Sequence, residues 1–201
     1  MAKVVAIVNQ KGGVGKTTTC VNLAAILRAK GLRVLLCDFD PQANATSGMG
    51  VDKTRSNGVY DVLINGMETE KAIVATPYGD VLPSSKALAG AGVEMIDLPD
   101  RQFLLKKALE QVRELYDYIF IDCPPIEMVA DTQIIDRYAD RTFFIIRAGL
   151  LERAMIPEVD NLYESKKYKN MALILNGTSN LKGRSGYGYG YGYGNGYKYG
   201  K

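Results

Sequence analysis

The stretch of sequence that decides the fold runs from residue 11 to residue 18 and reads Lys11-Gly12-Gly13-Val14-Gly15-Lys16-Thr17-Thr18. It follows an apolar run of strand length, residues 4–8, and opens an amphipathic stretch, residues 16–30, that predicts a helix ended by Gly31. Glycines in such a loop let main-chain N–H groups turn toward phosphate oxygens, and the helix N-terminus adds its positive dipole end. This context favours a phosphate-binding loop over a glycine turn without a ligand.

The polar residues of this P-loop (residues 11–18) have distinct expected roles. Lys16 would reach the β- and γ-phosphates of a nucleotide, and the Thr17 hydroxyl would ligate Mg²⁺. The other residues expected to contact the nucleotide are Gly12, Gly13, Val14, Gly15 and Thr18. The pattern departs from the common P-loop sequence because Gln10 takes the first glycine position and Lys11 is an additional, early lysine. The sequence therefore predicts a nucleotide with Mg²⁺ as the bound cofactors, and the family resemblance described below implies that the nucleotide is ATP.

Two further apolar runs end in acidic residues. Residues 33–37 lead to Asp38 and Asp40, and residues 118–121 lead to Asp122. Because the carboxyl ends of parallel strands form one edge of a sheet, these carboxylates are expected beside the P-loop. There, Asp38 and Asp122 are predicted to hold Mg²⁺ through water, and an acid of this group can orient an attacking water. The alternative for the first pair of acids is a turn or a helix N-cap.

The remaining pattern predicts the fold class. Further strands are expected at residues 80–82, 142–146 and 171–175, and further helices at 59–65, 101–115 and 158–166. Continuous apolar runs that alternate with helices predict an α/β fold, a doubly wound, mostly parallel sheet covered on both faces. We expect one P-loop NTPase domain over residues 1–181.

Composition excludes several classes of function. The 201 residues contain no histidine, which removes histidine general bases, Ser-His-Asp triads and the usual zinc sites. The three cysteines, Cys20, Cys37 and Cys123, lie among apolar neighbours and are expected to be buried thiols of a cytoplasmic protein. No apolar run approaches the roughly 20 residues of a membrane span.

The last 20 residues differ from the rest. Residues 182–201 hold eight Gly, six Tyr, four Lys or Arg and no acid, which leaves residues 1–181 with 21 basic and 22 acidic groups. This composition predicts a disordered tail, in which non-specific contact with DNA or an anionic membrane rests on the four positive charges. The tail is either a low-complexity linker or a phosphorylation cluster. The candidate phosphoacceptors are Tyr187, Tyr189, Tyr191, Tyr193, Tyr197 and Tyr199.

Residues 1–125 resemble the ParA/Soj/MinD ATPases, whose P-loop carries the same early lysine. The resemblance is carried by the P-loop, the stretch 38–48, the motifs at 82–85 and 88–90, and the stretch 116–125. It implies an ATP-dependent homodimer in which Lys11 reaches the partner's phosphates, with Asp40 positioning the water. It also implies an adenine contact for Asn176, for which a strand-ending Asn-Gly turn is the alternative. A centromere-binding protein would be the activator.

Residues 126–201 instead resemble the end of a bacterial tyrosine kinase of the CpsD/Wzc class. The resemblance is carried by residues 126–133, 140–141, 146–149, 175–177 and the tyrosine cluster. It implies tyrosine rather than water as phosphoryl acceptor and a membrane adaptor as partner. Both resemblances imply the same fold and nucleotide. We expect a switch ATPase. The alternatives are an autophosphorylating tyrosine kinase and a catalytically silent, nucleotide-gated module. The expected location is the cytoplasm, with membrane or nucleoid association.

Overall fold

The structure is a computed structural model that describes residues 1–54, 57–96, 98–125 and 138–178. The predicted domain boundary at residue 182, the basic tail and its six tyrosines lie outside the described residues, as do residues 126–133 of the kinase-like part. None of the described helices has the length and hydropathy needed to cross a lipid bilayer.

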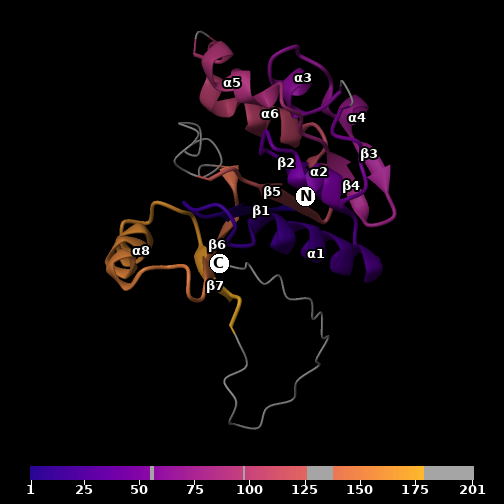
Figure 1. Ribbon diagram of the computed structural model, residues 1–201. Helices are drawn as coiled ribbons and strands as arrows, with labels where there is room; N and C mark the ends of the chain where they lie inside the picture. The colour runs from indigo at the N-terminus through magenta and orange to yellow at the C-terminus, as the bar shows by residue number, and fades with distance from the viewer. Residues whose placement is uncertain (55–56, 97, 126–137, 179–201) are drawn as a thin grey trace, which may run out of the picture.

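Seven strands form one sheet in the order β3-β4-β2-β5-β1-β6-β7 (Figure 1). Six of them run parallel, and β3 alone pairs antiparallel, with β4. Their bounds are β1 (Lys3–Val8), β2 (Val34–Asp38), β3 (Val74–Thr76), β4 (Gly79–Leu82), β5 (Tyr118–Asp122), β6 (Arg141–Arg147) and β7 (Met171–Asn176). The predicted α/β fold with a doubly wound, mostly parallel sheet is confirmed.

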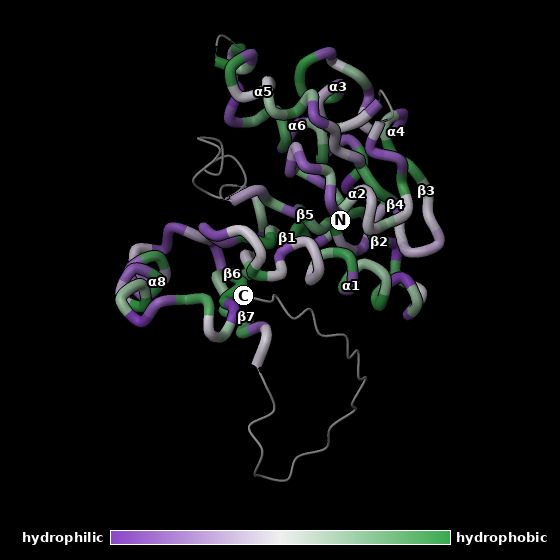
Figure 2. Tube along the Cα trace, viewed as in Figure 1, coloured by the Kyte–Doolittle hydropathy of each residue, from purple (hydrophilic) through white to green (hydrophobic). Residues whose placement is uncertain are grey.

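Helices cover both faces of this sheet. The α-helices are α1 (Lys16–Ala29), α2 (Asn44–Gly48), α3 (Val59–Leu63), α4 (Thr69–Ala72), α5 (Leu88–Glu94), α6 (Leu104–Glu110) and α8 (Ile156–Glu164). Val5 and Ile7 of β1 pack in the core that holds α1 and α2, whereas Val4 and Ala6 pack in the core that holds α3, α5, α6 and α8. Successive residues of β1 therefore enter two separate cores, which is why the central strands carry apolar residues on both faces (Figure 2).

The register places the ends of the central strands side by side. Asp38 of β2 pairs with Asp122 of β5, and Ile7 of β1 pairs with the same Asp122. On the other side of β1, Arg147 of β6 pairs with Asn176 of β7. The P-loop leaves β1 at this same edge, so residues from five strands meet there.

The predicted helix at 101–115 is wrong as one element. The chain forms a 3₁₀ turn (Arg101–Phe103), then α6, then a second 3₁₀ turn (Arg113–Leu115). The second turn directs Arg113 onto the Ala2 carbonyl and onto Asp140, at 2.8 Å from the carboxylate, and leaves Leu115 47% exposed. Contacts with distant segments therefore end the helix before its apolar periodicity does.

Coverage is incomplete at β7, the edge strand. Leu173 and Leu175 are 53% and 60% exposed, although their register partners on β6 share the face that α8 covers. The prediction of a sheet covered on both faces therefore holds for the central strands and fails at this edge, as far as the described residues extend. The three cysteines are fully buried and free, as predicted.

Candidate active site

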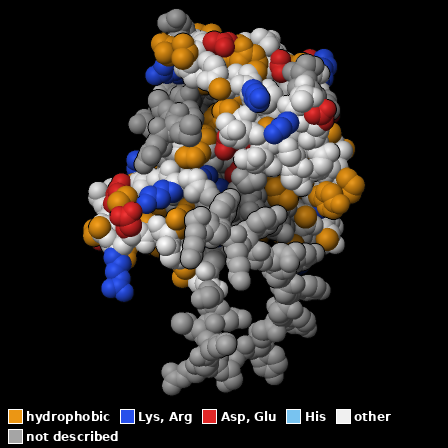
Figure 3. Space-filling model, viewed as in Figure 1, with side chains coloured by type: hydrophobic (Ala, Val, Ile, Leu, Met, Phe, Trp, Pro, Cys, Tyr) orange, Lys and Arg blue, Asp and Glu red, His pale blue; other side chains and the backbone are white. Residues whose placement is uncertain are grey.

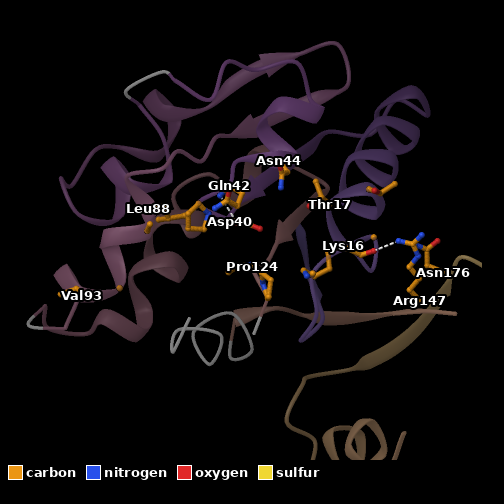
Figure 4. Close-up of a pocket in the computed structure, with 18 of the residues that line it drawn as sticks. Lys16, Thr17, Asp40, Gln42, Asn44, Leu88, Val93, Pro124, Arg147 and Asn176 are labelled. Carbon is orange, nitrogen blue, oxygen red and sulfur yellow. Dashed lines mark hydrogen bonds between the residues drawn. The ribbon is translucent and has the colours of Figure 1, made fainter. Parts of the chain in front are cut away.

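A cleft of about 1280 Å³ opens at the carboxyl edge of the sheet. The P-loop and the ends of β6 and β7 form one wall, and α5 with the loop after β2 forms the other (Figure 4). On the face seen in Figure 3, Lys, Arg, Asp and Glu side chains are scattered among hydrophobic ones. The predicted residues that line it are Gly12, Gly13, Gly15, Lys16, Thr17, Thr18, Asp40 and Asn176.

The P-loop wraps tightly between β1 and α1. Gly13 and Gly15 have φ of +71° and +107°, in the left-handed region that residues with a side chain rarely adopt. A Cβ on Gly15 would in addition overlap the Asn176 amide. Val14 turns its side chain into the core, so only its main chain can serve a ligand. The glycines therefore set the path of a loop whose main chain faces the cleft.

Lys16 stands at the start of α1 with its side chain buried. Its ammonium donates to the Lys11 carbonyl at 3.0 Å. Burial lowers the pKa of Lys16, while the nearby Asp122 and Asp40 act in the opposite sense. Desolvation of this kind makes an added anion favourable, because a phosphate oxygen supplies the counter-charge that water no longer supplies.

Asp122 ends β5 directly beneath the P-loop and is 1% exposed. Neither carboxylate oxygen accepts a well-formed hydrogen bond from a described residue. Burial raises the pKa of Asp122 to about 7, and the nearby Thr17 hydroxyl and Lys16 ammonium only partly offset this rise. A buried carboxylate without partners is costly, so the site is incomplete as it stands.

Asp38 lies beside Asp122 in the sheet but is fully partnered. One of its oxygens accepts from both the N–H and the hydroxyl of Thr46, each at 2.7 Å, and the other accepts from the Asp40 N–H at 3.2 Å. The Thr46 hydroxyl in turn accepts from the Ser84 N–H at 2.9 Å. Asp38 thus anchors α2 and the end of β4, and its predicted role toward Mg²⁺ stays a prediction.

Asp40 and Lys11 differ in their relation to the cleft. Asp40 is half-buried, lines the cleft, and accepts from the Gln42 N–H at 2.9 Å (Figure 4). The Lys11 ammonium lies 3.5 Å from Glu152 and its side chain is 41% exposed. The structure therefore brings Asp40 to the cleft, whereas Lys11 is not among the residues that line it.

Two residues that the sequence reasoning missed also belong here. Asn9, at the end of the first apolar run, is buried; its amide donates to the Ile145 carbonyl of β6 and its carbonyl oxygen accepts from the Lys11 N–H. Arg147 donates to the Gly13 carbonyl at 2.8 Å. Asn9 could have been found because it is a polar residue that ends an apolar run beside a glycine loop. Arg147 could have been found because it is a basic residue at the end of a predicted strand.

The residues present fit a magnesium nucleotide. Within the described part of the chain, no group of three or more Cys, Asp or Glu side chains could hold a metal ion alone. Magnesium in nucleotide sites needs fewer protein ligands, because phosphate oxygens and water complete its shell. The orphaned Asp122 carboxylate beside Thr17 provides the anionic side of such a shell, and Lys16 provides a charge for the phosphates.

Known proteins share this sequence pattern and this fold. The sporulation initiation inhibitor protein Soj of Bacillus subtilis is 52% identical over 128 residues, which cover 62% of this chain and 51% of Soj. The chain spans about half the length of the curated relatives it matches. The predicted resemblance of the first part of the chain to Soj is confirmed.

Solved structures align over more of the chain. Cobyrinic acid a,c-diamide synthase of Mycobacterium smegmatis, with bound ADP and magnesium, aligns with a TM-score of 0.75 at 32% identity, covering 86% of this chain and 72% of that one. The kinase domain of the Escherichia coli tyrosine kinase ETK aligns with a TM-score of 0.73 at 23% identity, covering 94% and 72%, and so shares the fold. A family model described as an AAA domain matches residues 2–147, well over half of the chain. The chain belongs to this AAA domain family.

Proposed function

We propose that the protein binds Mg-ATP and hydrolyses it as a switch ATPase of the ParA type. The observation that carries the proposal is the buried, unpartnered Asp122 carboxylate beneath a glycine loop that presents Lys16 and Thr17. A cation would stabilise an ionised carboxylate in this position, and the loop provides a place for a nucleotide-bound cation. The synthase that shares this fold was solved with ADP and magnesium.

Each residue has a specific task in this proposal. The Lys16 ammonium and the P-loop N–H groups bind the β- and γ-phosphates, and the Thr17 hydroxyl and Asp122 hold the hydrated cation. Mg²⁺ held by these residues would neutralise charge on the phosphate oxygens. Asp40 lines the cleft with a half-buried carboxylate and orients the attacking water.

The resemblance to Soj supports a second part of the proposal, the ATP-dependent homodimer. Lys11 would leave Glu152 and bind the partner's phosphates. The pair is exposed on both sides, at 41% and 75%, and exposed pairs contribute about 0–1 kcal/mol, so the phosphates of a partner can outcompete Glu152. Lys11→Ala should therefore bind ATP and remain monomeric, measured by light scattering after size exclusion; a Lys11→Ala dimer would contradict this role.

The function is tested with γ-labelled ATP. Wild-type protein should release label as free phosphate, Lys16→Ala should release none, and Lys30→Ala, at the far end of α1, should behave as wild type. Deletion of residues 182–201 should leave hydrolysis nearly intact. Label on tail tyrosines in the wild type that is absent in Lys16→Ala would instead support the kinase, and binding without turnover would support the silent module.

A further inference from the structure

We propose that Arg147 is a positioning residue that holds the P-loop in its phosphate-binding shape, acting from the end of β6 together with Asn176 of β7. This inference rests on the proposed function, since it concerns the same phosphate site. It adds a second support to the loop, on the side away from α5, and it gives Asn176 a task that does not depend on the nucleotide base.

The geometry consists of two consecutive carbonyls held from outside the loop. Arg147 Nη1 donates to the Gly13 carbonyl at 2.8 Å, and Asn176 Nδ2 donates to the Val14 carbonyl at 2.9 Å. Figure 4 shows Arg147 and Asn176 together on one side of the cleft. A trans peptide unit is planar, and its N–H points opposite to its C=O. Fixing these two carbonyls therefore fixes the N–H groups of Val14 and Gly15, which point away from the two side chains.

The surroundings keep the two side chains in place. Arg147 and Asn176 are register partners on adjacent strands, so both leave the sheet at the same level. The Gly177 N–H donates to the side-chain Oδ1 of Asn176 at 2.8 Å. This hydrogen bond orients the side-chain amide so that its nitrogen faces the loop. Gly177 has φ of +68°, and a Cβ there would lie 3.3 Å from Arg147 Cγ, so glycine leaves the room that the arginine side chain occupies.

The charge of Arg147 is also available to a ligand. Arg33 and Arg113 each form an ion pair with an aspartate, at 2.7 and 2.8 Å, whereas no carboxylate among the described residues pairs with Arg147. An unneutralised guanidinium at the rim of a phosphate site attracts a polyanion as well as holding the loop. Both effects act on the phosphates and neither acts on the base.

The experiment compares two ligands, ATP and inorganic tripolyphosphate, by calorimetry with the full chain. Arg147→Met should bind both about tenfold more weakly than wild type, by the same factor, because a lost hydrogen bond at the loop is felt by every ligand with phosphates. Arg147→Lys, which keeps the charge and a donor, should recover part of that loss. Arg141→Met, at the exposed opposite end of β6, is the matched control and should bind both ligands as wild type does.

The outcomes separate this inference from the proposed function. A loss confined to ATP would place Arg147 on the nucleoside and overturn the inference, and an unchanged affinity for both ligands would overturn it as well. If the wild type bound tripolyphosphate but not ATP, the ATPase proposal would be wrong. The role of Arg147 would then be tested by the tripolyphosphate measurements alone. An unchanged thermal unfolding midpoint of Arg147→Met without ligand would exclude a general loss of stability as the cause of weaker binding.

Discussion

Two neighbouring strands end in the same residue at the carboxyl edge of the sheet, in different hydrogen-bonding environments. Asp38 on β2 and Asp122 on β5 are register partners, and their exposures are 0% and 1%. Asp38 accepts three hydrogen bonds from the protein, whereas Asp122 accepts none that is well formed. Burial raises both pKa values, to about 6 and about 7 respectively, and the hydrogen bonds to Asp38 account for its smaller rise.

The difference shows that burial alone does not determine the role of a carboxylate. A buried carboxylate with protein donors is part of the scaffold, and removing it damages the fold. A buried carboxylate with few donors is costly to the fold, and a ligand can offset that cost. The two aspartates share a sequence context, an apolar strand followed by an acid, but differ in their hydrogen-bond partners, and we expect their substitutions to have different effects.

The largest effect is expected from Asp38→Ala. The substitution leaves the Thr46 N–H and hydroxyl and the Asp40 N–H without their acceptor in a buried region. We expect the free energy of unfolding to fall by about 3 kcal/mol, measured by urea denaturation. Asp38→Asn keeps an acceptor and should lose less. A loss below about 1 kcal/mol for Asp38→Ala would remove the distinction between the two aspartates.

Asp122→Asn should give the opposite result. The substitution keeps the shape of the side chain and removes a buried charge that Thr17 and Lys16 compensate only in part, so the ligand-free protein should unfold at a higher urea concentration than wild type. ATP hydrolysis should fall by at least about 100-fold, which corresponds to about 2.7 kcal/mol of transition-state stabilisation. A stable variant with full activity would show that Asp122 does not serve the cation.

The pH dependence of stability sharpens the comparison further. Both folded pKa values lie above the unfolded value of about 3.9, so the folded state holds protons that the unfolded state releases. This stabilisation is complete below about pH 4 and is lost as the pH rises through about 6 for Asp38 and about 7 for Asp122. We expect the free energy of unfolding, followed by thermal unfolding without metal and nucleotide, to fall between these limits.

The same titration in Asp122→Asn provides the control. The fall in stability should be smaller and should end near pH 6, because only Asp38 then releases its proton in this range. A pH profile identical to that of the wild type would show that the carboxyl of Asp122 does not carry the effect.

The smallest effect is expected from Thr46→Val, which removes one hydrogen-bond donor to Asp38 and so brings its surroundings closer to those of Asp122. Valine keeps the shape but removes the hydroxyl that donates to Asp38 and accepts from the Ser84 N–H, whereas the N–H of residue 46 still donates. We expect a loss of about 1–2 kcal/mol in the free energy of unfolding and a further rise in the pKa of Asp38. Ser47→Ala, on the same helix and bonded only to a helix carbonyl, should cost less.

Much of this arrangement was predictable from the sequence. The central strands are buried on both faces, so their apolar runs identify them, and the P-loop follows from its glycines between strand and helix. The sequence predicted both Asp38 and Asp122 at the edge of the sheet but could not separate them, because the donor to Asp38 is Thr46, whose position depends on the turn into α2.

What could not be predicted depends on contacts between distant segments. The break in the helix at 101–115 follows from Arg113 reaching Asp140, 27 residues away, and the role of Arg147 follows from Gly13, 134 residues away. Short elements were missed for a different reason: β3 has three residues, too few to show a period of two.

The way in which the P-loop is tied to β6 and β7 has an evolutionary consequence. Three hydrogen bonds join these regions, from Asn9 to Ile145, from Arg147 to Gly13 and from Asn176 to Val14, and each ends on a main-chain carbonyl. A main-chain carbonyl is the same whatever side chain its residue carries. For these three hydrogen bonds, recombination between two lineages of this fold with the junction after β5 therefore requires only the donor side chain to be inherited, whereas the two cores still have to pack across the junction.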